Sequence, residues 1–162
     1  DVVTFTSPVL QEAVEIAGPV QAVFYASSSA PDTDFIVRLL DVDPEGNSIK
    51  LAQGVLRARY RKSFADPELL TPGQVECYTI RLDDVANSFR PGHRIRLSIT
   101  SSAHKYIFEN HNTGLDPASD IDYQTAVQRI YCGGPFASRL ELRLVRGTLP
   151  GREVQAPENQ VP

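Results

Sequence analysis

Serine, histidine and acidic residues gather in the second half of the chain, where their types could support hydrolysis. Ser101, Ser102 and His104 are close neighbours in the sequence. The members of a Ser-His-acid triad, however, come from separate elements of a fold, so adjacency in sequence does not indicate one. The chain also lacks a Gly-x-Ser-x-Gly motif, the sharp turn that exposes a nucleophilic serine. We therefore expect no catalytic residue in this chain.

Metal binding is a second chemistry that some side chains could support by type: His93, His104, His111, Asp116, Asp120 and Asp122. Their spacings match neither a zinc motif nor an EF-hand loop, so polar side chains of a solvated loop are the better interpretation. Cys77 and Cys132 also form no metal-spaced motif. We expect neither a metal nor another cofactor. The two thiols are expected to be reduced, as in a cytoplasmic protein, unless their strands are neighbours.

Three arginines alternate along one segment of the chain. Arg57, Arg59 and Arg61 occupy positions i, i+2 and i+4 of a strand predicted over residues 49–61, so they would lie on one strand face. Guanidinium groups in this pattern could bind an anionic sugar or a phosphate. Ion pairs with nearby acidic residues or with a neighbouring domain use the same chemistry, and we favour the ion pairs.

The elements that position these residues are strands. The clearest strand is predicted over residues 93–100, because apolar residues alternate there with polar ones: Ile95, Leu97 and Ile99. Pro91-Gly92 is a turn signal just before it. From residue 101 to residue 122 the sequence has neither the period of a strand nor that of a helix. Loops of this length are usually functional or docked on another surface.

Other segments have strand patterns too, and the fold class follows from them. Strands are predicted over residues 2–6 (an edge or linker strand), 13–16, 20–26, 35–42 (an internal strand, apolar on both faces), 49–61, 78–82, 124–132 and 139–144, with Gly18-Pro19 as a turn. No segment has helical spacing beyond a single turn at residues 66–70. An all-β sandwich or jelly roll is predicted. Its core is expected to contain Tyr78, Ile80, Ile95, Leu97, Ile99, Leu140, Leu142 and Leu144.

Length and composition limit the possible classes of protein. The 162 residues, with 41% hydrophobic and 22% charged residues, suit one globular domain, predicted over residues 1–147 with a surface tail at 148–162. A net charge of −4 gives no support to nucleic-acid binding. No apolar run approaches the roughly 20 residues that span a bilayer. The chain opens on Asp1 and directly on a strand, which indicates a piece of a longer polypeptide.

Four motifs resemble one known family. They are GVLRARYR at residues 54–61, LTPG at 70–73, FRPGHRIRL at 89–97 and NHNTG at 110–114. In this order they resemble the C-terminal β-sandwich domain of hydrolases of the cocaine esterase and X-Pro dipeptidyl-peptidase type, the CocE/NonD family. The resemblance covers nearly the whole chain, from about Val2 to Val145.

The resemblance implies a non-catalytic domain with a jelly-roll, galactose-binding-domain-like fold. In that family the sandwich follows an α/β-hydrolase domain in the same polypeptide, and the triad of the serine esterase, acylase or X-Pro peptidase belongs to that domain. The sandwich packs on the catalytic domain and, in some members, helps to wall the substrate pocket. The alternative is a carbohydrate-binding jelly roll. The absence of Trp counts mildly against that alternative.

Contacts with the catalytic domain are expected from two loops, residues 62–73 and 101–122, which are more apolar than free loops need to be. The Asn side chains of the second loop can also tie its backbone. In the chain alone, such a surface would fold back or support a homo-oligomer. The candidate contacts are Arg57, Arg59, Arg61, Phe64, Leu69, Leu70, Tyr106, Ile107, Phe108, Asn110 and Asn112.

Overall fold

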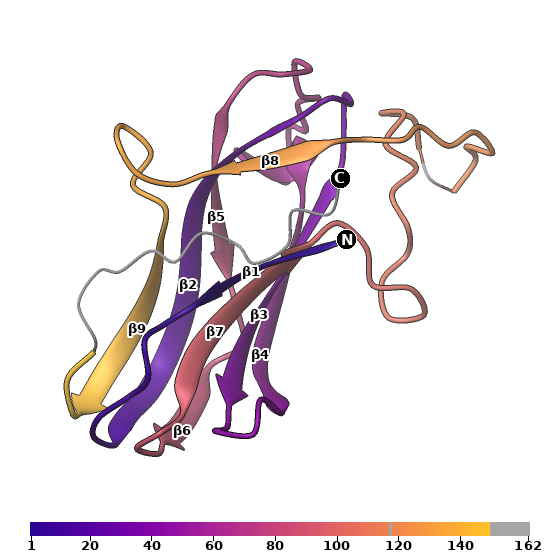
Figure 1. Cartoon of the computed structure of the whole chain (residues 1–162). Coiled ribbons are helices and arrows are strands. Elements are labelled where there is room, and N and C mark those ends of the chain that lie inside the picture. The colour runs from indigo at the N-terminus through magenta and orange to yellow at the C-terminus, as the bar shows by residue number, and fades with distance from the viewer. Residues whose placement is uncertain (117, 150–162) are drawn as a thin grey trace.

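The computed structural model describes residues 1–116 and 118–149, and its regular structure is almost entirely β (Figure 1). Within these ranges the strands are β1 (Val2–Thr6), β2 (Val14–Ser28), β3 (Asp34–Val42), β4 (Ser48–Arg57), β5 (Glu76–Arg81), β6 (Val85–Phe89), β7 (Arg94–Thr100), β8 (Gln128–Tyr131) and β9 (Arg139–Arg146). A short 3-10 helix, η1 (Ala58–Tyr60), follows β4. No helix in these ranges has the length and apolar character needed to cross a bilayer.

The strands form two antiparallel sheets. The first sheet has the order β1-β7-β3-β4. β1 is therefore an edge strand, one of the two alternatives for this segment, and β3 is an internal strand, as the sequence predicts. In the second sheet every other strand pairs with the long strand β2. β9 pairs with a stretch of β2, residues 15–23, that overlaps the stretches paired with β5 (21–26) and β6 (14–18), so β9 lies along the other edge of β2. The stretch paired with β8, residues 25–28, overlaps that of β5, so β8 lies along the same edge as β9. The prediction of an all-β sandwich is confirmed.

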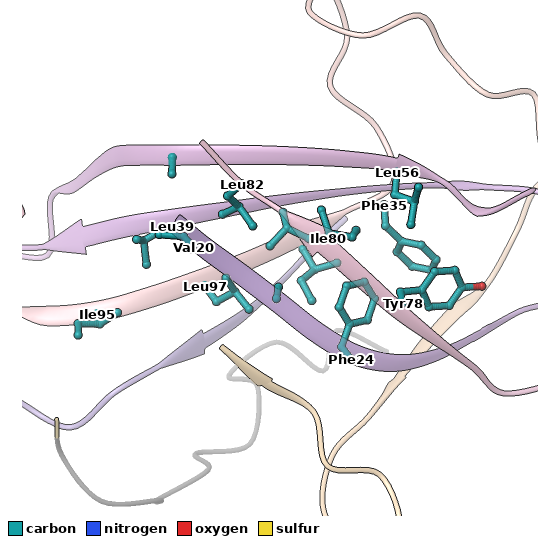
Figure 2. Packing of buried hydrophobic residues seen from close by; sticks show 14 of the residues in the cluster. Val20, Phe24, Phe35, Leu39, Leu56, Tyr78, Ile80, Leu82, Ile95 and Leu97 are labelled. Atoms are coloured by element: carbon teal, nitrogen blue, oxygen red, sulfur yellow. The ribbon is translucent and has the colours of Figure 1, made fainter. Parts of the chain in front are cut away.

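The core lies between the two sheets (Figure 2). At one end of it the rings of Phe24, Phe35 and Tyr78 pack together, with centroids 4.7 to 5.6 Å apart. Burial raises the pKa of the Tyr78 phenol far above its ordinary value. Five of the predicted core residues are buried: Tyr78, Ile80, Ile95, Leu97 and Ile99.

The predicted core residues of β9 behave differently. Leu140 and Leu142 are partly buried and pack against the core. Leu144 is 42% exposed, so its assignment to the core is wrong. Alternation correctly predicts the strand but not how far the opposite sheet extends over it. Leu144 pairs with Ile16 beyond an irregularity in the register, at the far end of the strand.

Two glycines explain features that the sequence patterns do not predict: the continuous course of β2 through Gly18 and the close approach of the two sheets at Gly54. Gly18-Pro19 is not a turn, because β2 runs through it with an irregular register toward β9 and with φ of +122° at Gly18. Gly54 allows the sheets to approach at one edge, since a Cβ there would lie 2.5 Å from the Arg81 carbonyl oxygen. Next to it, Asp83 and Gln53 exchange two hydrogen bonds of 3.1 Å that join the sheets.

Two predicted strands are shorter in the structure. β4 ends at Arg57 rather than at Arg61, because the Ala58 N–H donates to the Thr33 carbonyl and the chain turns into η1. The three arginines therefore do not share one strand face. β8 comprises only residues 128–131 of the predicted 124–132, so the preceding loop is longer than expected.

The cysteines are free thiols in this structure. Cys77 lies on β5 and Cys132 directly follows β8, and β2 separates these two strands, so they are not neighbours. Burial raises the pKa of the Cys132 thiol. Of the predicted tail at 148–162, residues 150–162 lie outside the described part of the chain.

Candidate functional site

Two loops leave the sandwich at the end opposite the β3–β4 turn (Figure 1). We call residues 61–75, between η1 and β5, the short loop, and residues 101–127, between β7 and β8, the long loop. The loops touch, because a Cβ added at Gly114 would lie only 3.2 Å from a methyl group of Leu69. They therefore form one continuous surface.

Two buried carboxylates lie beneath these loops. Asp34, at the start of β3, and Asp32, just before it, are almost fully buried. Arg57 donates to Asp34 through Nε (2.9 Å) and Nη2 (3.1 Å). Arg59 donates to Asp32 through Nε (2.8 Å) and through its backbone N–H (3.0 Å). Buried charges require such pairing, and the hydrogen bonds from Arg57 to Asp34 raise the pKa of that arginine.

Asn110 connects the long loop to both carboxylates. Its Nδ2 amide donates to Asp32 Oδ2 and to Asp34 Oδ1, each at 2.9 Å. Its Oδ1 accepts the backbone N–H of Asn112 at 2.9 Å, which closes a local turn. Asn112 has a positive φ of 63°, which Asn tolerates better than most residues, and its Nδ2 donates to the Gln124 carbonyl. Both asparagines therefore hold loop backbone, as the sequence predicts.

The arginines also bind loop backbone directly. Arg57 Nη2 donates to the Phe108 carbonyl (3.4 Å), and Arg59 Nη2 donates to the Leu115 carbonyl (3.0 Å). Arg61 is nearly buried and holds the short loop instead, through the Glu68 carbonyl at 2.6 Å and the Glu76 carboxylate at 3.3 Å. The alternating arginines thus act as three separate ties within the domain. We name Asp32, Asp34, Arg57, Arg59 and Asn110 the loop anchor.

A second polar cluster lies inside the long loop. Asp120 accepts a hydrogen bond from the Thr113 hydroxyl, which holds the pKa of that carboxyl below its ordinary value. Its Oδ2 lies 3.8 Å from Nδ1 of the buried His111, whose ring packs on Tyr123 with centroids 4.0 Å apart. This cluster gives the loop internal structure without a strand or helix.

The two loops carry a group of exposed apolar side chains. Phe64, Tyr106 and Phe108 are 79%, 85% and 66% exposed, and Leu69 is half-exposed. Ile107 is partly buried. Leu70 has to be corrected, because only 6% of it is exposed and it packs in the core of the domain. Sequence reasoning missed further exposed apolar residues of the long loop, which lack any strand or helix period: Leu115, Ile121, Tyr123 and Val127.

The candidate catalytic and metal-binding residues do not assemble into a site, although His111 and Asp120 lie in one cluster. Within the described residues, no serine hydroxyl is hydrogen-bonded to a histidine. His93 pairs with Asp41 and His104 with Glu109. No group of three His, Cys, Asp or Glu side chains in the described part of the chain is placed to hold a metal ion. The arrangement that remains is an exposed apolar surface on two loops that hydrogen bonds connect to the sandwich.

The fold is a two-sheet β-sandwich with an exposed apolar surface on its loops. Residues 1–141 match the X-Pro dipeptidyl-peptidase C-terminal non-catalytic domain, and the chain belongs to this family. It is 38% identical over 150 residues to the cocaine esterase of Rhodococcus sp. (strain MB1 Bresler), covering 90% of this chain and 26% of that enzyme.

Solved structures agree with this family. An α-amino acid ester hydrolase matches with a TM-score of 0.85 and 32% identity, over 89% of this chain and 25% of that protein. An aminopeptidase from the marine sediment archaeon Thaumarchaeota archaeon matches with a TM-score of 0.82 and 30% identity, over 90% of this chain and 26% of that protein. The chain thus spans about a quarter of the length of these relatives. The resemblance to CocE/NonD C-terminal domains is confirmed, and the comparisons do not support the carbohydrate-binding alternative.

Proposed function

We propose that this domain belongs to a larger serine hydrolase that cleaves acyl esters, amides or X-Pro peptides. The catalytic serine, histidine and acid would lie in an α/β-hydrolase domain that precedes it in the same polypeptide. Family membership supports this proposal, as does the quarter share of the relatives' length that the chain covers. The role of the sandwich is to pack on the catalytic domain and to help wall its substrate pocket.

The observation that carries the docking role is the exposure of Phe64, Tyr106 and Phe108 on two loops that arginine hydrogen bonds connect to the sandwich. The Phe108 carbonyl accepts from Arg57, and Arg57 is held by the buried Asp34. A rigid loop loses little conformational entropy on association, so its aromatic side chains can contribute most of their burial energy to binding. Aromatic residues are also the side chains most enriched at the centres of interfaces.

Activity assays test where the chemistry resides. The 162-residue chain and the complete polypeptide that contains it are assayed with p-nitrophenyl esters and X-Pro p-nitroanilides. We expect turnover by the complete polypeptide and none by the chain. Turnover by the chain that disappears in Ser101→Ala or Ser102→Ala would refute the accessory role. A complete polypeptide that cleaves neither class of substrate would refute the proposed activity.

Variants test the docking surface. Phe64→Ser with Phe108→Ser should leave the melting temperature of the chain within about 2 °C, since exposed substitutions usually change stability by under about 0.5 kcal/mol. The same pair should destabilise the complete polypeptide or lower its kcat/KM. Val145→Ser is the control, because Val145 is also apolar and exposed but lies on β9 of the second sheet, away from both loops. Equal effects of the control and the loop pair would place the interface elsewhere.

A further inference from the structure

Four cations lie together on the outer face of the first sheet: Arg38, Lys50, Arg94 and Arg96. In the register of the strands, Arg96 and Lys50 flank Leu40 on either side. Arg94 is opposite Val42, two residues further along β3, and Arg38 is two residues before Leu40. We call these four residues the basic face.

The direction of these side chains follows from the core. Leu39 and Leu97 pair with each other across β3 and β7 and are buried between the sheets. Because successive residues of a strand point to opposite faces, Arg38 and Arg96 point away from the core. Strands lie about 4.8 Å apart, and alternate residues of a strand lie about 7 Å apart. Three strands thus concentrate four positive charges within a patch on the order of 10 Å across.

Within residues 1–116 and 118–149, the basic face has no acidic partner. Among the described residues, no carboxylate lies within 4.0 Å of any of the four cations, whereas Arg57, Arg59 and Arg61 all pair with carboxylates. Neutral groups of the domain hold the three arginines of the face instead. Arg38 Nε donates to Gln53 (2.9 Å), Arg96 Nε to Thr6 (2.9 Å) and Arg94 Nη1 to the Ser7 carbonyl (3.0 Å).

These contacts orient the guanidinium groups and leave most of their donors unused. Each guanidinium has five N–H donors in a planar fork that matches the two oxygens of a carboxylate. Because the side chains are half-buried and already held, little rotamer entropy remains to be lost when an anion binds. Four neighbouring like charges also repel one another until an anion is present.

We infer that the basic face binds carboxylate side chains on the catalytic domain of the same polypeptide, an inference that rests on the proposed function. Two of the groups that hold the arginines, Thr6 and Ser7, belong to or directly follow β1, the edge strand of this sheet and the first strand of the chain. A domain that precedes β1 therefore connects to this sheet. A nucleic acid is the poorer partner, since the net charge of −4 repels a polyanion.

The test compares melting temperatures of the chain and of the complete polypeptide. Two charge-reversal variants are used: Arg38→Glu with Arg96→Glu, and Lys50→Glu, whose side chain is exposed. Arg129→Glu with Arg143→Glu is the matched control, because both are exposed cations of the second sheet. We expect the basic-face variants to lower the melting temperature of the complete polypeptide by at least about 4 °C. The chain alone and the control should change by less than about 2 °C.

Salt provides a second readout. In 1 M NaCl the Debye length is about 3 Å, so the difference between the wild type and the basic-face variants should shrink by at least about half. A complete polypeptide insensitive to both variants, or a salt-independent loss, would overturn the inference. Equal destabilisation of the chain alone by both variants would also overturn it, because the cations would then serve the fold of the domain. Hydrolase activity of the complete polypeptide is measured separately, so failure of the proposed function is distinguished from failure of this inference.

Discussion

Asp32 and Asp34 explain why the long loop has a defined position although it contains no strand or helix. Each carboxylate is buried, and each accepts hydrogen bonds from an arginine and from Asn110. Leaving one of these acceptors without a donor in a buried place costs more than the hydrogen bond itself contributes. At the scale of single residues, the loop anchor is therefore the feature most sensitive to substitution.

Asn110→Ala should release the long loop while the sandwich stays folded. It removes both amide hydrogen bonds to the carboxylates, and we expect a loss of about 1 to 3 kcal/mol in urea unfolding and faster proteolysis within residues 101–127. Asn110→Asp should be worse, since it places a third carboxylate against two others. His104→Ala is the control within the same loop, because its pairing with Glu109 is exposed. If the control and Asn110→Ala were equally mild, the anchor would not position the loop.

The pH dependence of stability should report the Thr113–Asp120 hydrogen bond. Since the folded pKa of Asp120 is lowered, the charged carboxylate stabilises the fold above the unfolded pKa, about 3.9, and this stabilisation is lost as the pH falls through the folded value. Thr113→Val should raise the pKa of Asp120, as measured by NMR titration, and flatten the acid limb of the stability curve. Ser119→Ala, an exposed neighbour, should leave the pKa of Asp120 unchanged. An unaltered titration in Thr113→Val would show that another group sets this pKa.

At the scale of elements, β7 and β9 have the same alternating pattern but different environments. β7 lies between β1 and β3, and its apolar residues face the core. Among the described strands β9 pairs only with β2, and its apolar side chains become more exposed toward its end. The opposite sheet therefore decides how much burial a given pattern obtains.

Leu97→Ala and Leu144→Ala form a matched pair for this difference. Leu97→Ala should destabilise the chain by about 2 to 5 kcal/mol, because it loses transfer energy and leaves a cavity. Leu144→Ala removes the same atoms from a side chain that is 42% exposed, so about 1 kcal/mol or less is expected. Chemical denaturation of both variants measures the difference. A Leu97→Ala loss below about 0.5 kcal/mol would mean that the strand phase is wrong.

At the scale of the whole molecule, the two loops contain residues that stabilise the domain itself and residues that are available to contact a partner. Buried loop residues such as Leu70 pack in the core of the domain, whereas exposed loop residues such as Phe108 are candidates for contact with another domain. The basic face lies on the same sheet as β1, the strand to which the proposed catalytic domain would connect. The basic face lies toward the β3–β4 turn, at the other end of the sandwich from the apolar loops, so the two are candidates for separate contact areas.

Leu69→Ser and Leu70→Ser compare two adjacent residues, of which Leu70 is a core side chain and Leu69 a candidate interface side chain. Leu70→Ser should destabilise the chain alone by about 2 to 5 kcal/mol, because the side chain is only 6% exposed. Leu69→Ser should cost the chain about 1 kcal/mol or less but should destabilise the complete polypeptide further. Melting temperatures of both forms measure the two effects. A Leu69→Ser variant that affects the chain and the complete polypeptide equally would remove Leu69 from the docking surface.

The sequence by itself determined the local features of this protein. A period of two residues predicts strands such as β7, Pro91-Gly92 predicts the turn before it, and the four motifs indicate the family, because these signals depend only on neighbouring residues. The asparagines were also correctly expected to tie loop backbone. Only the tertiary structure decided that Leu70 is buried, that Leu144 is exposed and that Arg57 and Arg59 pair with Asp34 and Asp32. Burial and ion pairing depend on which distant segments the fold brings together, and alternation along one strand contains no information about them.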